Sequence, residues 1–454
     1  MTNKALSIFS LFITLLLFSC NNDDGGNPEP ETTRTIMVYL NAENNLSSDA
    51  LVDLDEIVKG SKGLSSNCRL LVYIDDSYNS KNADSPYPRI YSISNGTKNL
   101  VKKYEEMDSS SPTVIRNVLN YIITNYPADE YVTIFWGHGT GTEISSQTSN
   151  SLSLQFDADA NDPNAYGWDN NDNSSGSKPS QTWTNIPDLA AALDELPKQQ
   201  LIMFDACLML SAENAYELRN CTDYLIGAVC ETPTFGANFE KLIPILGQSI
   251  NQDTAGDIVN HYISDNTWGV YNIDRSDGVC ISAVKTSEME NLLSATKTAF
   301  SSLDRNTLPL ELTTKFAEDG DGATSCIFYF KTQRNRYAPP IYYDIKDVMR
   351  VNLSEDAYQM WLTALNKAVI ATWHPRDIRQ LTDGICPWIP TMLSGDEITN
   401  DFKKFCLSDE RYGGMSIFVP QKQYESYTSP NMNKRMYDYE WCQKVGWEDL
   451  GWTR

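Results

Sequence analysis

The sequence predicts an α/β protein in which helices cover both faces of a largely parallel β-sheet. Several short apolar runs are near-continuous rather than alternating, which is typical of strands that are buried on both faces. Segments with apolar residues three to four positions apart lie between these runs, which is typical of amphipathic helices. This alternation of strand and helix favours parallel pairing, because each crossover helix packs back onto the sheet.

The first half of the chain supplies the elements expected for this sheet. Strands are expected at 36–40, 70–74, 131–136 and 201–204, and helices at 48–62, 111–126 and 186–196. A further helix is expected directly after Cys207, over about 208–219, followed by a strand over 224–229. From about residue 250 the chain alternates helical and strand-like runs, including a strand over 415–420. We therefore expect a C-terminal α/β extension of the core.

The N-terminal segment has the features of a secretory signal. Lys4 precedes an apolar stretch over 5–17, and Leu-Phe-Ser-Cys at 17–20 resembles the lipobox of bacterial lipoproteins. Cys20 would then carry a lipid anchor, and residues 21–33, rich in Asn, Asp, Gly and Pro, would form a flexible tether. The alternative is an unlipidated Cys20 in a cleaved peptide. We expect residues 1–20 to direct export of a lipoprotein to the outer membrane or cell surface of a diderm bacterium. The protein could face either the periplasm or the outside of the cell.

Composition and charge exclude some classes of partner. The chain has 454 residues, of which 41% are hydrophobic, and this suffices for a sizeable core. Its formal net charge of −24 argues against nucleic acid, because nucleic-acid binding needs a basic face. Nine of the ten cysteines remain when Cys20 is set aside. Because this number is odd, at least one thiol would be free or would form an intermolecular disulfide. We expect a monomer.

Two residues at predicted strand ends have the properties of a catalytic pair. His138 follows the strand over 131–136, and Gly137 and Gly139 on either side let the backbone turn sharply. Cys207 follows the strand over 201–204, and the helix predicted after it would stabilise a thiolate. Each residue alone has a common structural explanation, a structural histidine or a small buried thiol. Together, at corresponding ends of consecutive strands, they match a Cys/His dyad.

Three motifs resemble the clostripain-like cysteine peptidases of the caspase and gingipain clan. They are MVYLNAENNL at 37–46, FDACLM at 204–209 and MSIFVP at 415–420. The resemblance implies a caspase-like core over 34–250, containing an acidic Asn/Asp/Ser insertion loop over 142–184, with residues 251–454 completing the fold. It also implies a cysteine endopeptidase that cuts protein or peptide substrates after Arg or Lys.

The family resemblance assigns roles to individual residues. His138 would act as general base and Cys207 as nucleophile, with the backbone N–H groups of Gly139 and Cys207 holding the oxyanion. Asp205 would place a carboxylate at the bottom of the pocket for a basic side chain; its alternative role is to cap the following helix. Glu231 is a looser second candidate for that pocket, so a different or broader side-chain preference stays open.

The acidic insertion also contains candidate metal ligands. Calcium dependence occurs in the resembled family, and residues 157–162 alternate oxygen ligands as calcium loops do. Asp157 and Asp159 are therefore candidate calcium ligands, although the Gly and Glu that complete a calcium loop are missing and a solvated acidic loop is the alternative. The chemistry itself requires no cofactor. The rival hypothesis from another class is a non-catalytic surface lipoprotein that binds peptide or glycan.

Overall fold

The computed structural model describes the chain in several stretches, and Thr32–Arg454 form one compact unit. The described residues are 33–76, 87–142, 166–169, 182–232, 236–263, 279–303, 313–316, 325–329, 342–374, 408–421, 424 and 432–447. The predicted signal peptide, residues 21–32 of the predicted tether and most of the acidic insertion lie outside these residues. The predictions for Cys20, Asp157 and Asp159 therefore also lie outside them.

A nine-stranded sheet forms the centre of the unit, in the order β14-β10-β9-β8-β5-β1-β2-β3-β4. Its strands are β1 (Arg34–Asn41), β2 (Cys68–Asp75), β3 (Arg89–Ser94), β4 (Thr97–Lys103), β5 (Glu130–Trp136), β8 (Gln199–Asp205), β9 (Thr222–Ala228), β10 (Ile281–Lys285) and β14 (Val369–Trp373). The five central strands, from β9 to β2, pair in parallel. The prediction of a largely parallel sheet is confirmed. Antiparallel strands extend it at both edges.

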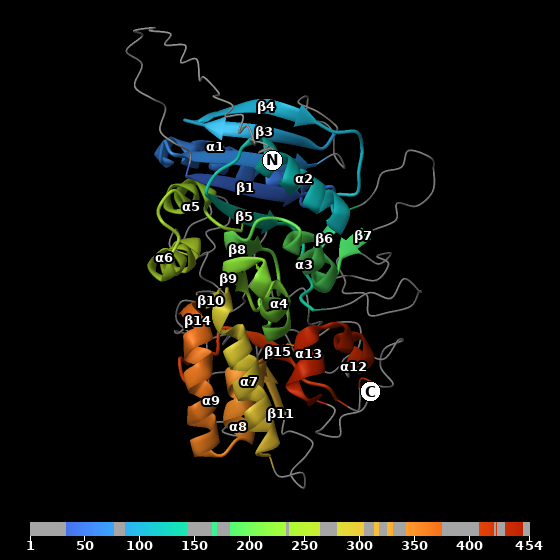
Figure 1. The fold of residues 1–454 in the computed structure, drawn as a ribbon, viewed down its shortest axis with the longest axis vertical. Coiled ribbons are helices and arrows are strands. Elements are labelled where there is room, and N and C mark those ends of the chain that lie inside the picture. Colours follow the sequence, from blue (N-terminus) through green and yellow to red (C-terminus); the bar gives the residue numbers. More distant parts are fainter. Residues whose placement is uncertain are drawn as a thin grey trace, which may run out of the picture. The chain divides into compact units, whose positions relative to one another are not determined.

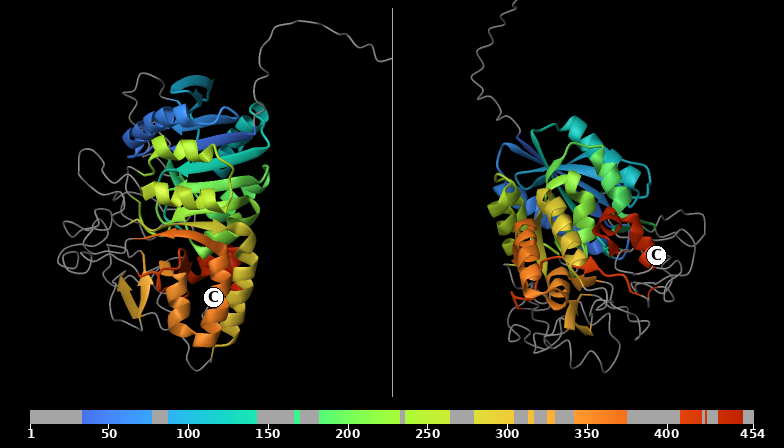
Figure 2. Two further views of the ribbon diagram at one scale, coloured as in Figure 1. Left: turned by 90° about the vertical axis from the view of Figure 1, so that its left-hand side faces the viewer. Right: turned by 60° about the horizontal axis from the view of Figure 1, so that its bottom comes forward.

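Helices cover both faces of this sheet, as predicted (Figure 1). Helices α1 (Ser47–Gly60), α5 (Phe239–Leu246) and α6 (Gln252–Ile263) share one hydrophobic core with one face of the sheet. Helices α2 (Pro112–Asn125), α3 (Ile186–Asp194) and α4 (Ala212–Glu217) share the other core. Figure 2 shows the two helical layers on opposite sides of the strands.

The C-terminal part adds a second, four-stranded sheet and further helices. The strands are β11 (Thr313–Phe316), β12 (Ser325–Phe328), β13 (Tyr342–Asp344) and β15 (Ser416–Phe418). The helices are α7 (Met289–Ser301), α8 (Ile345–Asn352), α9 (Glu355–Ala368), α12 (Met432–Arg435) and α13 (Glu440–Val445). Their buried side chains join the core that also covers α2, α3 and α4. The C-terminal extension therefore packs continuously with the core.

The chain directly after Cys207 departs from the prediction. No helix begins there, because Leu208 adopts a left-handed backbone with φ of 63°. The N–H of Leu210 donates to the carbonyl of Ala228, so this stretch is bonded as extended chain. Ser211 then caps α4, accepting a hydrogen bond from the N–H of Asn214. The prediction of a helix starting at 208 is wrong by several residues.

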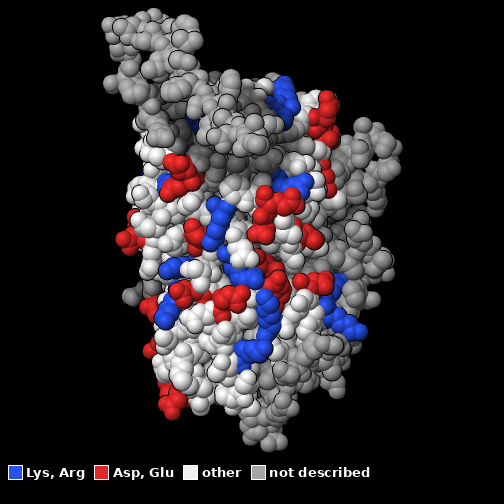
Figure 3. Space-filling view, viewed as in Figure 1, with Lys and Arg blue, Asp and Glu red and all other residues white. Residues whose placement is uncertain are grey.

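Three further observations concern the surface charge, the helices and the cysteine thiols of the described part of the chain. Acidic and basic side chains are interspersed on the face drawn in Figure 3. Among the described residues, no helix combines the length and the apolarity that a membrane crossing requires. The cysteines in the described part of the chain are all free thiols, namely Cys68, Cys207, Cys221, Cys230, Cys280, Cys326 and Cys442.

Candidate active site

Strands β5 and β8 bring His138 and Cys207 to the same edge of the sheet. The two strands pair in parallel, with Trp136 opposite Asp205. His138 lies two residues beyond Trp136, and Cys207 lies two residues beyond Asp205. Adjacent strands are about 4.8 Å apart, so the two loops leave the sheet side by side. This edge holds the carboxyl ends of the parallel strands, where α/β sheets bind their ligands.

The loop that carries His138 packs directly against the loop that carries Cys207. A Cβ atom at Gly139 would overlap the backbone oxygen of Cys207 and would lie 2.9 Å from the sulfur of Met209. Gly137 has a φ of 143°, and a Cβ there would lie 2.8 Å from the carbonyl oxygen of Asn41. Both glycines flanking His138 are therefore required by close approach of neighbouring backbone.

His138 is held by a polar contact on one ring nitrogen and by aromatic side chains around the ring. Its Nε2 lies 2.8 Å from Oδ1 of Asn45. The ring centroid is 5.0 Å from that of Trp168 and 6.3 Å from that of Trp183. Burial lowers the pKa of His138 to about 3. A neutral imidazole with its proton on Nε2 leaves Nδ1 as the basic nitrogen.

Cys207 lies beside the loop that follows β9. Its Sγ accepts a hydrogen bond from the N–H of Thr232 at 3.3 Å and lies 3.6 Å from the Thr232 hydroxyl. Burial, and then the nearby Glu231 carboxyl, raise the pKa of the Cys207 thiol to about 12. The expectation of a thiolate stabilised by a helix N-terminus is therefore wrong for the free protein, since α4 begins five residues later and burial favours the neutral thiol.

The backbone N–H groups predicted to hold an oxyanion both lie in these loops. No described residue accepts a hydrogen bond from the N–H of Gly139 or of Cys207. The carbonyl of His138 is engaged, because it accepts from the N–H of Gly167 at 3.0 Å. Backbone donors without an acceptor within the protein are available to a ligand.

Asp205 is buried and turned toward the segment 236–262. Its Oδ1 accepts a hydrogen bond from the hydroxyl of Tyr262 at 2.7 Å, and its Oδ2 accepts from the N–H of Ala237 at 3.0 Å. Both of these donors are uncharged. The alternative role as a helix cap is wrong, because Ser211 caps α4.

Glu231 is also buried, but its surroundings differ from those of Asp205. Burial, and then the nearby Cys230, raise its pKa well above the ordinary value, which favours an uncharged carboxyl. Its electrostatic effect falls on Cys207. No hydrogen bond joins Glu231 to Asp205 among the described residues, and a pocket lined by both carboxyls stays a prediction.

Several residues around the site were not predicted. Trp168 lies on β6 (Tyr166–Asp169) and Trp183 on β7 (Thr182–Thr184), which pair as a two-stranded sheet inside the acidic insertion. Their rings stack on each other at 6.0 Å beside His138. Asn45 lies in the motif at 37–46, whose Asn-rich end was the available signal. Both tryptophans are large apolar residues in a loop that is rich in Asn, Asp and Ser.

Comparisons with known proteins identify the family of the chain. The model of the clostripain family matches residues 38–449. Clostripain from Hathewaya histolytica is 30% identical over 202 residues, which make up 41% of this chain and 36% of that protein. The chain thus matches about a third of the length of that relative.

Two solved structures have the same fold. A secreted C11 cysteine protease from Bacteroides thetaiotaomicron, in complex with an irreversible peptide inhibitor, has a TM-score of 0.66 at 24% identity, covering 92% of this chain and 99% of that one. An inactive zymogen C11 protease from Parabacteroides distasonis has a TM-score of 0.63 at 23% identity, with the same coverage of 92% and 99%. These likenesses extend over nearly the whole chain.

Proposed function

The chain belongs to the clostripain family, a family of cysteine peptidases, and we propose that it is a cysteine endopeptidase in which Cys207 is the nucleophile and His138 the general base. The observation that carries this proposal is the placement of both residues two positions beyond paired residues of β5 and β8. The contact between the Gly139 and Cys207 loops supports it. A peptide is the proposed substrate.

The proposed reaction starts from a neutral thiol and a neutral imidazole. As Sγ of Cys207 attacks the peptide carbonyl carbon, its proton passes to Nδ1 of His138. The imidazolium then donates this proton to the leaving amine, and an acyl-enzyme remains. Water, deprotonated by the same imidazole, releases the acid and restores the thiol. The Asn45 oxygen holds the opposite ring nitrogen throughout.

The oxyanion is proposed to lie between the N–H groups of Gly139 and Cys207. Both donors lack an acceptor among the described residues. Donors fixed in place before the reaction contribute about 3 kcal/mol each to stabilising the transition state. The N–H of Thr232 meets the sulfur instead, which helps to hold Sγ in position.

Cleavage after Arg or Lys is the proposed specificity, with Asp205 as its determinant. The Asp205 carboxylate is buried two residues from the nucleophile, and the donors identified here are a hydroxyl and an amide. A buried carboxylate can form a bidentate, charge-assisted pair with a guanidinium, which favours a basic substrate side chain over a neutral one. Glu231 is the weaker candidate, because burial raises its pKa and an uncharged carboxyl attracts a cation less.

Export as a lipoprotein anchored through Cys20, to the outer membrane or cell surface, is part of the proposal. It is supported by the lipobox-like sequence at 17–20. The relative from Bacteroides thetaiotaomicron is described as secreted. Mass spectrometry of the mature protein would test it, through the presence or absence of a diacylglycerol on Cys20.

Affinity labelling tests the dyad. The purified protein is treated with an Arg-based chloromethyl ketone, and the alkylated residue is mapped. We expect alkylation of Cys207, abolished in His138→Ala and unchanged in His261→Ala. His261 is the matched control, because it lies on α6 and its Nδ1 is 2.8 Å from the carbonyl oxygen of Asp257 on the same helix. Peptide hydrolysis that survives in Cys207→Ala would refute the proposal.

A further inference from the structure

Trp168 lies beside His138 on a strand that other parts of the chain hold in place. The N–H of Gly167, the residue before it, donates to the carbonyl of His138 at 3.0 Å. The backbone N–H of Trp168 donates to Oδ1 of Asn41 at 3.0 Å, and its carbonyl accepts from the side-chain amide of Asn44 at 2.7 Å. The backbone of Trp168 is therefore fixed both to the histidine loop and to the chain at the end of β1.

The ring of Trp168 lies close enough to the imidazole of His138 to act on its charge. The two ring centroids are 5.0 Å apart, and the ring planes are tilted by 39°. Trp183 is farther from the imidazole, at 6.3 Å, and stacks on Trp168. The Trp168 and His138 side chains are 3% and 5% exposed, so water screens this contact little. An aromatic ring attracts a cation within about 6 Å of its centroid, and the attraction is stronger where water is excluded.

The proposed reaction creates a positive charge on His138. The proton of Cys207 moves to Nδ1 as the sulfur attacks the peptide carbonyl, so a neutral imidazole becomes an imidazolium. Burial disfavours this charge, and it lowers the pKa of His138 to about 3. The contact on the opposite ring nitrogen is with the uncharged amide of Asn45. A further group that favours the imidazolium would therefore lower the barrier to this step.

We propose that the ring of Trp168 stabilises the imidazolium of His138 during the reaction through a cation–π contact. Trp attracts cations more strongly than Tyr or Phe does. The ring favours the charged imidazolium over the neutral imidazole, so it stabilises the transition state more than the free protein. Because its backbone is fixed, the ring needs no rearrangement when the charge forms. This role rests on the proposed function, since the charge arises in that reaction.

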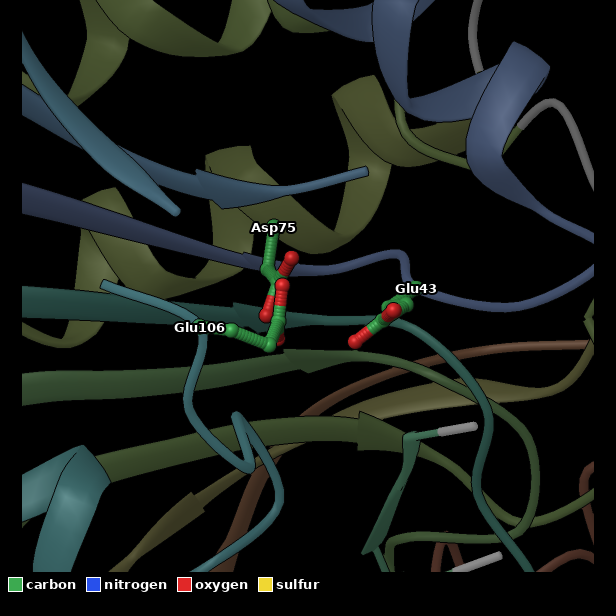
Figure 4. Close-up of side chains that lie close together, drawn as sticks. All are labelled: Glu43, Asp75 and Glu106. Atoms are coloured by element: carbon green, nitrogen blue, oxygen red, sulfur yellow. The ribbon is translucent and has the colours of Figure 1, made fainter. Parts of the chain in front are cut away.

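The carboxyl cluster beyond the ends of β1 and β2 is the alternative source of such stabilisation. Figure 4 shows Glu43, Asp75 and Glu106 facing one another, and one carboxyl oxygen from each lies within 4.8 Å of the others. Burial, and then neighbouring carboxyls, raise the pKa of Asp75 well above its ordinary value, which favours the uncharged form. An uncharged Asp75 contributes little to the field at His138. The variant Asp75→Asn therefore tests the contribution of the cluster without removing the ring.

Fluorinated tryptophan tests the contact while keeping the ring in place. Each fluorine withdraws electrons from the ring and so weakens its attraction for a cation. The full mature chain is produced with tryptophan, 5-fluorotryptophan or 5,7-difluorotryptophan, as the parent and as Trp168→Phe. We expect kcat/KM for a fluorogenic Arg peptide to fall stepwise in the parent, about threefold in all, and to stay constant in Trp168→Phe. The variant keeps the other nine of the ten tryptophans, so it controls for their fluorination.

Substitutions give the size of the effect. Trp168→Leu should lower kcat/KM about thirtyfold, because the imidazolium then lacks an aromatic face, and Trp168→Phe should lower it less. Trp183→Leu is the matched control, because it removes the same ring from the neighbouring strand β7, and it should cost at most about twofold. Equal losses in Trp168→Leu and Trp183→Leu, or a fluorine series that is flat in an active parent, would overturn the proposal. A thirtyfold loss in Asp75→Asn would assign the stabilisation to the carboxyl cluster instead.

A readout that needs no activity separates the ring contact from the proposed function. In Cys207→Ala, with Asn45→Asp added so that a carboxylate brings the pKa of His138 into an accessible range, the imidazole is titrated by NMR of 15N-labelled histidine. Trp168→Leu should lower this pKa by about one, a tenfold change in the ratio of the two protonation states, and Trp183→Leu should not. An equal pKa with and without the Trp168 ring would overturn the proposal. If the pKa falls but the active parent neither hydrolyses peptides nor is alkylated at Cys207, the proposed function fails while the cation–π contact stands.

Discussion

Burial governs the protonation of both residues of the proposed dyad. It lowers the pKa of His138 to about 3 and, with the nearby Glu231, raises that of Cys207 to about 12. Burial therefore favours the uncharged form of both groups in the free protein. Substrate attack then requires proton transfer in the same step, in contrast to a preformed thiolate–imidazolium pair.

The buried imidazole makes a pH dependence of stability testable. The folded pKa of His138 lies below the unfolded value of about 6.5, so the unfolded chain binds more protons between the two. Stability from this residue is complete above pH 6.5 and is lost as pH falls, by about 1.4 kcal/mol per pH unit. The free energy of unfolding, measured with urea, should fall between pH 7 and pH 5 in the parent. In His138→Gln this fall should be smaller by about 2 kcal/mol. The same loss in parent and variant, with His261→Gln at a partly buried histidine as control, would contradict this.

Asn45 is expected to be a positioning residue for His138. Its Oδ1 fixes the tautomer that leaves Nδ1 basic. Asn45→Ala should lower kcat about tenfold with little change in KM, because the ring loses its orientation. Asn45→Asp should keep the contact but raise the pKa of His138, which moves the acid limb of the kcat/KM profile to higher pH. An unmoved acid limb would mean that Asn45 has a structural role only.

Asp205→Asn removes the negative charge at the proposed pocket but keeps the hydrogen bonds of the side chain. The amide can still accept from the N–H of Ala237 and donate to the hydroxyl of Tyr262, so both contacts survive. The parent should cleave Arg or Lys substrates at least ~100-fold better than Leu substrates, and Asp205→Asn should lose most of this ratio, about 2.7 kcal/mol. Retained preference in the variant would assign Asp205 to holding the 236–262 segment.

What the sequence could and could not predict differs from residue to residue. His138 and Cys207 were identifiable because each follows an apolar strand in a distinctive local context. Asn45 and Trp168 reach His138 only through tertiary packing, since they lie 93 residues before it and 30 residues after it. No local periodicity encodes such convergence.

At the scale of elements, the central strands were predictable and the edges were not. Strands buried on both faces are continuously apolar, whereas β3 and β4 at the edge contain charged and polar residues. The turn between them was nevertheless available, because Asn95-Gly96, with φ of 46° and 75°, is the dipeptide that favours a tight hairpin. The helix predicted directly after Cys207 failed because long-range backbone bonds, such as that of Leu210 to Ala228, outweighed local propensity.

At the scale of the whole molecule, the C-terminal half supports both loops of the proposed dyad. The N–H of Ser416 on β15 donates to the carbonyl of Leu210 at 3.1 Å, just after Cys207. Strand β10 pairs with β9 and continues the central sheet. The division into residues 34–250 and 251–454 stays a prediction, but contacts of this kind indicate that the first part depends on the second.

Tyr342 on β13 gives this dependence a direct test. Its hydroxyl donates to the carbonyl of Thr140 and accepts from the N–H of Thr142 at 3.1 Å, so it bridges the loop that follows His138. Tyr342→Phe leaves both buried groups without this partner, at a cost of about 1–3 kcal/mol. Tyr343→Phe is the matched control, because its equally buried hydroxyl contacts Gln421 instead.

Both variants should lower the Tm by a similar amount, since each loses one buried hydroxyl. Only Tyr342→Phe should also lower kcat/KM for a peptide substrate, by at least ~10-fold, because only its hydroxyl fixes the backbone that presents His138 and Gly139. The measurement is made at a temperature well below both midpoints, so that the folded fraction is equal. If the two variants lose activity in equal measure, the C-terminal half stabilises the fold without positioning the site.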